Sequence, residues 1–162
     1  MAALTAASQR RYRLWGKSVL QNYRVMNSQT IYVGSFVGTP GTVGLTSARG
    51  YARTYTDEQT IEWLGLAIGS PFNLSTTNTI VGDTSASPVI EVSCETGPFV
   101  LEQYTVTGVS AQTDVGKALY ARNDNDLNLT ASQAPAVGRV EYWWSSTTSD
   151  ALLYGRLAAI VI

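Results

Sequence analysis

From residue 30 onward, short apolar and aromatic runs alternate with clusters of Gly, Pro, Asn, Asp and Ser. Runs rich in Val, Ile, Thr, Tyr and Trp that end at such clusters are typical of successive β-strands joined by turns. The pattern predicts strands over residues 30–37, 61–68, 88–94, 99–107, 117–121, 127–130, 137–144 and 151–162. About eight short strands with little helix predict an all-β fold, with residues 23–162 forming a single compact barrel or sandwich domain.

Alternation within residues 137–144 assigns side chains to the two faces of that strand, because successive side chains point in opposite directions. The set predicted to face the core is Val140, Tyr142 and Trp144. The set predicted to face outward is Arg139, Glu141 and Trp143. An outward tryptophan beside charges either lies over a neighbouring loop or contacts a partner, since aromatic and arginine side chains are enriched in interfaces.

Residues 1–22 show no strand alternation, and we expect them to form an N-terminal arm, helical or extended, ahead of the β-domain. They contain the chain's one cluster of basic and aromatic side chains: Arg10, Arg11, Tyr12, Arg13, Trp15 and Lys17. Because arginine and aromatic side chains are frequent interface anchors, the cluster is a candidate for docking on an acidic protein surface. A solvated tail and a thin nucleic-acid arm are the alternatives.

The charge is distributed unevenly along the chain, although the net charge is only −1. The first 56 residues contain seven basic residues and no acidic one, whereas the remainder contains four basic residues and all twelve acidic ones. Either the two parts interleave and neutralise each other in the fold, or the molecule has a basic side. The small net charge argues against a chain devoted to nucleic acid, so no nucleic-acid partner is expected.

The sequence offers little for catalysis. It contains no histidine, which removes the most common general acid–base residue and every histidine-containing triad or metal site. Cys94 is the only cysteine, and alternation in residues 88–94 predicts that its thiol is buried and unreactive. The acidic group Asp57, Glu58 and Glu62 is explained by a solvated turn. We therefore expect no catalytic residue, and the protein is predicted not to be an enzyme.

Metal, cofactor and membrane sites are also not expected. Asp124, Asp126 and Asn128 have the alternate spacing of calcium-loop ligands, but the turn glycine and the terminal glutamate of such a loop are missing. A hairpin turn is the preferred interpretation of this segment. The longest apolar run is far shorter than the roughly 20 residues of a membrane helix, so no membrane partner is expected.

Several short motifs of the C-terminal half occur in a recognisable order. They are a Gly116-Lys117-Ala118-Leu119-Tyr120 strand, an acidic turn, a Thr-rich strand around residues 127–130, and Val137-Gly138-Arg139-Val140. Residues 30–37 and 64–67 are similar to the early strands of the same proteins. Over residues 30–162, the chain in this way resembles the small head-decoration proteins of tailed bacteriophages. Residues 72–87, which are rich in Thr, Ser and Asn, and the basic arm depart from that pattern.

The resemblance implies a compact β-barrel or tulip-like fold, commonly trimeric, that sits on the outer capsid surface of the virion and cements coat subunits. It implies no active site and no cofactor. The expected partners are the major capsid protein, bound through the basic and aromatic arm, and further copies of the chain in a homotrimer. Trp143, with Arg139 and Glu141, is the candidate subunit interface, because a symmetric ring would bury such an aromatic on every copy. A coat or tail component and a carbohydrate-binding β-sandwich are the alternatives.

Overall fold

The computed structural model describes residues 10–17, 19–40, 51–71, 78–83, 85–86, 89–131 and 133–154. These residues form thirteen β-strands, one 3-10 turn and no α-helix, which confirms the all-β fold predicted from the sequence. The strands are β1 (Tyr12–Leu14), β2 (Leu20–Val25), β3 (Thr30–Tyr32), β4 (Phe36–Pro40), β5 (Tyr51–Thr54), β6 (Ile61–Gly69), β7 (Thr79–Val81), β8 (Glu91–Glu95), β9 (Phe99–Thr107), β10 (Ala118–Asn123), β11 (Asp126–Asn128), β12 (Gly138–Trp143) and β13 (Thr148–Leu153), and the turn is η1 (Gln112–Asp114).

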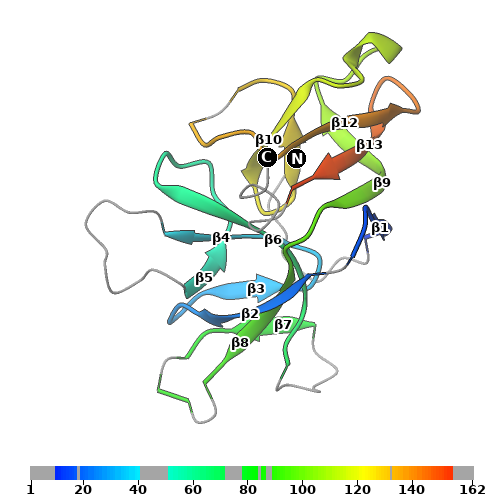
Figure 1. Cartoon of the computed structure of the whole chain (residues 1–162). Coiled ribbons are helices and arrows are strands. Elements are labelled where there is room, and N and C mark those ends of the chain that lie inside the picture. The colour runs from blue at the N-terminus through cyan, green and yellow to red at the C-terminus, as the bar shows by residue number, and fades with distance from the viewer. Residues whose placement is uncertain are drawn as a thin grey trace.

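The strands close into two rings. The first is a closed barrel of β2, β5, β4, β6 and β8. The second ring runs through β9, β11, β10, β12 and β13, and it closes because β13 pairs with β9. β1 pairs with the edge of β9 opposite to β13 and so extends this sheet. β3 and β7 form a separate two-stranded ribbon. Figure 1 shows β10, β12 and β13 in its upper half and β2, β3, β7 and β8 in its lower half.

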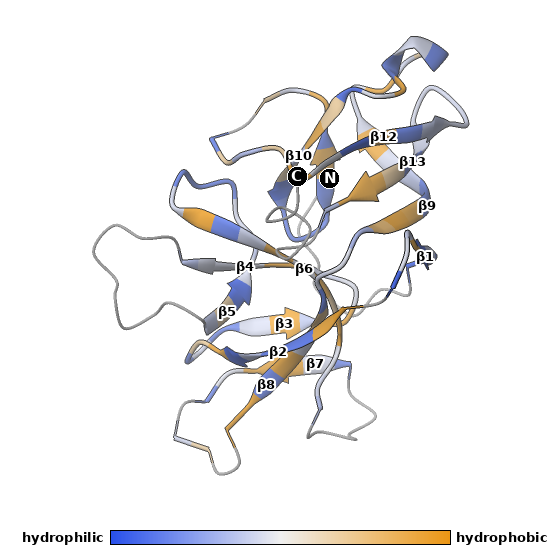
Figure 2. Cartoon of the chain, viewed as in Figure 1, coloured by the Kyte–Doolittle hydropathy of each residue, from blue (hydrophilic) through white to orange (hydrophobic). Residues whose placement is uncertain are grey.

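The β4 and β6 strands of the first barrel separate its core from the core of the second barrel. Phe36 and Val37 are neighbours in β4, so their side chains point to opposite faces. Phe36 packs in the core of the second barrel, whereas Val37 packs in the core of the first. Leu66 and Ala67 divide in the same way in β6. Both faces of this sheet are therefore buried at these positions, while Figure 2 shows polar as well as hydrophobic positions along β6.

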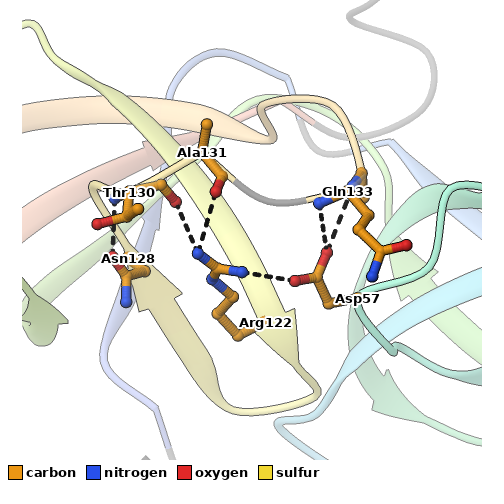
Figure 3. A network of polar contacts seen from close by, with 7 residues as sticks. Asp57, Arg122, Asn128, Thr130, Ala131 and Gln133 are labelled. Carbon is orange, nitrogen blue, oxygen red and sulfur yellow. Dashed lines mark hydrogen bonds and ion pairs between the residues drawn. The ribbon is translucent and has the colours of Figure 1, made fainter.

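A polar network ties the loop between β5 and β6 to the second barrel (Figure 3). The Asp57 carboxylate accepts a hydrogen bond of 2.7 Å from the Arg122 guanidinium and one of 3.0 Å from the backbone N–H of Gln133. Arg122 also donates to the backbone oxygens of Thr130 and Ala131 at 3.2 and 3.1 Å. Asp57 was expected to lie in a solvated turn, and it instead holds an ion pair that joins segments 65 residues apart.

The predicted arm is corrected by the structure. Residues 12–14 form β1, which pairs antiparallel with β9, and β2 begins at Leu20 and pairs with β8. The backbone oxygen of Arg11 accepts from the N–H of Glu102 at 2.9 Å, and the N–H of Trp15 donates to Pro98 at 3.0 Å. Sequence alternation missed β1 because all three of its residues are exposed, so the strand has no apolar side to mark it.

Strand prediction succeeded where apolar runs are long. β6 and β9 coincide with predicted strands to within one residue. The strand predicted over residues 30–37 is broken into β3 and β4 by a turn at which Gly34 adopts a φ of 88°. The strands β1, β2, β5 and β7 were not predicted. β13 starts three residues before its predicted beginning, and residues 155–162 of that prediction lie outside the described part of the chain.

Asp114 closes the turn that carries η1. One of its carboxylate oxygens accepts from the backbone N–H groups of Ser110 and Ala111 at 2.7 and 3.0 Å, and the other accepts from the Lys117 ammonium at 2.6 Å. The hydrogen bond from Lys117, followed by the two backbone hydrogen bonds, holds the pKa of Asp114 well below its usual range. The charged carboxylate is therefore stabilised by folding.

This depressed pKa predicts an acid-dependent loss of stability. A carboxyl whose pKa is lower in the folded than in the unfolded chain contributes stability above its unfolded pKa of about 3.9 and loses that contribution as the pH falls further. Thermal melts of the wild type and of Asp114→Asn should therefore differ most near neutral pH, and the difference should shrink progressively as the pH falls below about 4 toward the depressed pKa of Asp114. A melting-temperature difference that stays constant down to strongly acidic pH would contradict this assignment.

Candidate protein-binding surface on β1

Arg10 does not belong to an exposed docking cluster, although the sequence placed it there. Its guanidinium donates at 2.7 Å to the Tyr104 hydroxyl and at 2.8 Å to the side-chain oxygen of Asn125. A third hydrogen bond of 3.2 Å goes to the backbone oxygen of Asp124, and the Phe36 ring lies 4.4 Å below the guanidinium carbon. Burial lowers the pKa of Arg10 and raises that of Tyr104 to about 12. Arg10 therefore anchors the N-terminal segment between the two barrels.

The other members of the predicted cluster are exposed along the β1 segment, with Arg11, Arg13 and Trp15 on one face and Tyr12 on the other. They and one apolar neighbour form what we call the β1 surface: Arg11, Tyr12, Arg13, Leu14, Trp15 and Lys17, all of which are exposed. Trp15 is 45% exposed, and the guanidinium carbon of Arg13 lies 5.6 Å from its ring centre. Within the described residues, half of the eight large exposed hydrophobic side chains fall between residues 12 and 20. Such a concentration is typical of an interaction surface.

The β1 surface has an excess of positive charge. Arg11 and Arg13 both lie near the single carboxylate of Glu102, at 4.0 and 3.3 Å. The Arg11 side chain is 74% exposed, and an ion pair this open to solvent stabilises the fold by about 1 kcal/mol at most. Both guanidinium groups can therefore turn toward carboxylates of another molecule at little cost.

β1 also presents a strand edge. Arg11 and Trp15 direct their backbone polar groups toward β9, and hydrogen-bonding direction alternates along an antiparallel strand. The N–H and C=O groups of Tyr12 and Leu14 consequently point away from β9. In the described part of the chain, β1 pairs with no strand except β9. The outer edge of β1 is thus a place where a further strand could add.

A cavity of about 330 Å³ lies next to β1. It is bounded by the start of the β1 segment, by the turn between β3 and β4, and by the end of β6. Its lining residues are Arg10, Tyr12, Val33, Gly34, Leu66, Ala67 and Ile68. This lining is mostly apolar with one cation, so the cavity has room for an apolar group.

The outward orientation predicted for Trp143, the central residue of the candidate subunit interface, is wrong. Trp143 does not face outward, because its ring packs against the core of the second barrel. Arg139 and Glu141 do form a surface ion pair, with 3.2 Å between their nitrogen and oxygen atoms. The reversal is caused by a β-bulge: Val140 pairs with Ala151 and Tyr142 with Asp150, so Glu141 is an extra residue in β12.

The bulge moves a different pair of aromatic side chains to the surface. Tyr142 and Trp144, which were predicted to face the core, are 49% and 50% exposed. Simple alternation could not reveal this, because one inserted residue shifts every later side chain to the opposite face. The only sequence signal was the run of three aromatic residues at 142–144, which guarantees an outward aromatic in either register.

Cys94 is fully buried as predicted, and burial raises the pKa of its thiol. Among the described residues, no group of three or more His, Cys, Asp or Glu side chains is placed to hold a metal ion. Those residues likewise include no helix of the length and hydrophobicity needed to cross a membrane.

Comparison of the chain with protein families, with curated proteins and with solved structures gave no match in any of the three. The resemblance to head-decoration proteins therefore rests on the short sequence motifs alone. The β1 surface combines exposed aromatic and arginine side chains with an open strand edge.

Proposed function

We propose that this protein is a structural, non-enzymatic module that decorates the outside of a bacteriophage head, and that it binds acidic coat subunits through the β1 surface. The observation that carries the proposal is the coincidence of exposed aromatic and arginine side chains with an open strand edge at β1. The sequence motifs shared with head-decoration proteins favour the same function. No catalytic group is required for it.

The proposed docking mode is strand addition. An extended coat segment pairs with the outward N–H and C=O groups of Tyr12 and Leu14, and the cavity beside β1 accepts one of its side chains. In such complexes the backbone hydrogen bonds supply affinity and the side-chain pocket supplies specificity. Arg11 and Arg13 meet acidic side chains of the segment. A protein that binds the assembled shell but not the free coat subunits stabilises the shell by mass action.

A homotrimer remains part of the proposal. Attachment of three copies to neighbouring coat subunits would make modest single contacts strong in combination. Light scattering of the purified protein and inspection of particles by electron microscopy test the oligomeric state. Shell formation by the purified chain alone would indicate the rival role of a coat subunit.

The strand-addition mode predicts different effects of two substitutions at one position. Leu14→Pro removes the outward N–H but keeps the bonds to β9, and proline is tolerated on an open strand edge. Leu14→Ala removes the apolar side chain and keeps the N–H. In co-sedimentation with undecorated shells of the parent virus, Leu14→Pro should bind at least about tenfold more weakly than Leu14→Ala, a difference of about 1.4 kcal/mol. Equal binding of the two variants would exclude strand addition at β1.

The charge of the β1 surface predicts salt-sensitive docking. Exposed ion pairs are screened when the Debye length falls from about 10 Å at 0.1 M salt to about 3 Å at 1 M. Wild-type binding should therefore weaken along a salt series, and Arg11→Ser combined with Arg13→Ser should flatten that dependence. The aromatic contacts should retain part of the affinity at high salt, because apolar burial is not screened. Salt-independent binding of the wild type would rule out an acidic partner surface.

A further inference from the structure

The second barrel displays another side-chain cluster, remote from β1 in sequence, on the outer face of three adjacent strands. The strand order there is β12, β13 and β9, as Figure 1 shows. Residues paired across strands share a face, and the register pairs Tyr142 with Asp150 and Thr148 with Thr105. We call this set the aromatic face: Tyr142, Trp144, Thr148, Asp150, Gln103 and Thr105.

Two irregularities of the sheet create the aromatic face. The bulge at Glu141 turns Tyr142 and Trp144 outward. On the other side of β13, Ser149 pairs with Tyr104 and Ala151 with Leu101, so two residues of β9 oppose Asp150 alone. One of those two is Gln103, which adopts a φ of 49°. A non-glycine residue in this region costs on the order of 1 kcal/mol or more and usually persists at functional sites.

Asp150 holds the arrangement together. Its Oδ1 atom accepts a hydrogen bond of 2.7 Å from the Trp144 indole N–H and another of 2.9 Å from the backbone N–H of Gln103. The Tyr142 and Trp144 rings lie 4.8 Å apart between centroids, with their planes inclined by 58°. Trp144 is thus both half exposed and fixed in orientation. Fixing a side chain before a ligand arrives reduces the entropy lost on binding.

The surroundings of the two rings indicate the chemistry of the ligand. The exposed neighbours Gln103 and Thr105 are uncharged hydrogen-bonding residues. The turn that follows Trp144 continues this character, because residues 145–147 are Ser, Ser and Thr. A ligand that suits this face has an apolar ring surface for the aromatic side chains and a rim of uncharged hydroxyl groups for the hydroxyl and amide side chains. Sugar rings have both features.

We propose that the aromatic face is a binding site for neutral carbohydrate, in which Tyr142 and Trp144 stack on the C–H surface of a sugar ring and Asp150 is the positioning residue. This binding is additional to the docking proposed for β1 and does not depend on it. It would let a particle that carries many copies attach to polysaccharide at a surface, because many weak contacts add up.

The test is affinity electrophoresis of the full chain in native gels that contain dextran, mannan or galactan. The wild type should be retarded by at least one of these polymers, and the retardation should not change between low and high salt because the ligand is neutral. Trp144→Ala should lose at least tenfold in affinity. Trp15→Ala is the matched control, since Trp15 is comparably exposed but lies on the β1 surface. Trp144→Phe keeps a ring and removes the bond to Asp150, so it should bind between the wild type and Trp144→Ala.

Two results would overturn the proposal: no retardation of the folded wild type by any of the three polymers, or an equal loss with Trp144→Ala and Trp15→Ala. Thermal melts confirm that each variant is folded. Shell co-sedimentation separates this site from the β1 surface, because Trp144→Ala should bind shells normally and Leu14→Pro should keep its retardation by polysaccharide. Loss of shell binding in Trp144→Ala, without any polysaccharide binding by the wild type, would reassign the aromatic face to a protein interface.

Discussion

Replacement of Gly65 by alanine is expected to cost about 4 kcal/mol of folding free energy, a large part of the 5–15 kcal/mol typical of a domain. Gly65 lies in β6 with a φ of 150°, and a Cβ atom there would be 2.0 Å from the backbone oxygen of Glu95. That oxygen belongs to β8, so it cannot swing away as a side chain could. Backbone strain and overpacking each cost roughly 1–3 kcal/mol. Urea unfolding should show the loss as a lower transition midpoint.

Gly69→Ala is the control for this experiment. Gly69 lies in the same strand with a similar φ of 158°, but no atom of the described residues comes within 4 Å of the position of its Cβ. Only the conformational strain should then remain, at about 1 kcal/mol. The difference between the two variants isolates the close approach of β6 to β8. Equal destabilisation of Gly65→Ala and Gly69→Ala would show that this close approach does not constrain the fold.

Replacement of Arg10 by methionine is expected to destabilise the protein by about 3 kcal/mol. Hydrogen bonds to a charged group contribute about 1.5–3 kcal/mol each, and Arg10 donates to Tyr104 and Asn125. Methionine retains much of the apolar packing against Phe36, so the lost polar contacts dominate. Arg10→Lys should also destabilise, because a single ammonium cannot reproduce the planar fork.

Arg11→Met provides the comparison, because Arg11 is the next residue and its side chain is largely exposed. Its effect on the unfolding free energy should stay within about 0.5 kcal/mol, as is usual for surface substitutions. Chemical denaturation of the two variants measures the contrast. If Arg10→Met were as stable as Arg11→Met, the hydrogen bonds of Arg10 would contribute nothing to the junction of the barrels.

The arginine side chains of the N-terminal segment have different environments. Sequence pattern grouped Arg10, Arg11 and Arg13 in one cluster, but the structure separates the buried Arg10 from the exposed Arg11 and Arg13. Arg10 fixes the segment, and Arg11 and Arg13 remain exposed beside Glu102. Removal of residues 1–22 would thus delete β1 and the first half of β2 along with any docking residues. Single substitutions in the β1 surface are the sharper test of docking.

The sequence by itself determined the features that depend on local pattern. The apolar runs of β6 and β9 predicted those strands, because a long strand buried in a core needs continuous or alternating hydrophobic residues. The alternation around Cys94 predicted its burial correctly. Acidic and asparagine residues predicted the hairpin turn between β10 and β11, where turn residues bond their own backbone. The absence of histidine excluded histidine-based catalysis and histidine metal sites without any coordinates.

The tertiary structure alone decided the features that depend on contacts between distant residues. The anchoring of Arg10 requires Tyr104 and Asn125, which lie about a hundred residues away in the chain. β1 is a strand only because β9 offers it an edge, and closure of both rings depends on pairings that no local pattern encodes. The bulge at Glu141 reverses the faces of Trp143 and Trp144, because one inserted residue shifts a period of two. Which aromatic side chains reach solvent is therefore a property of the sheet register, while their presence is a property of the sequence.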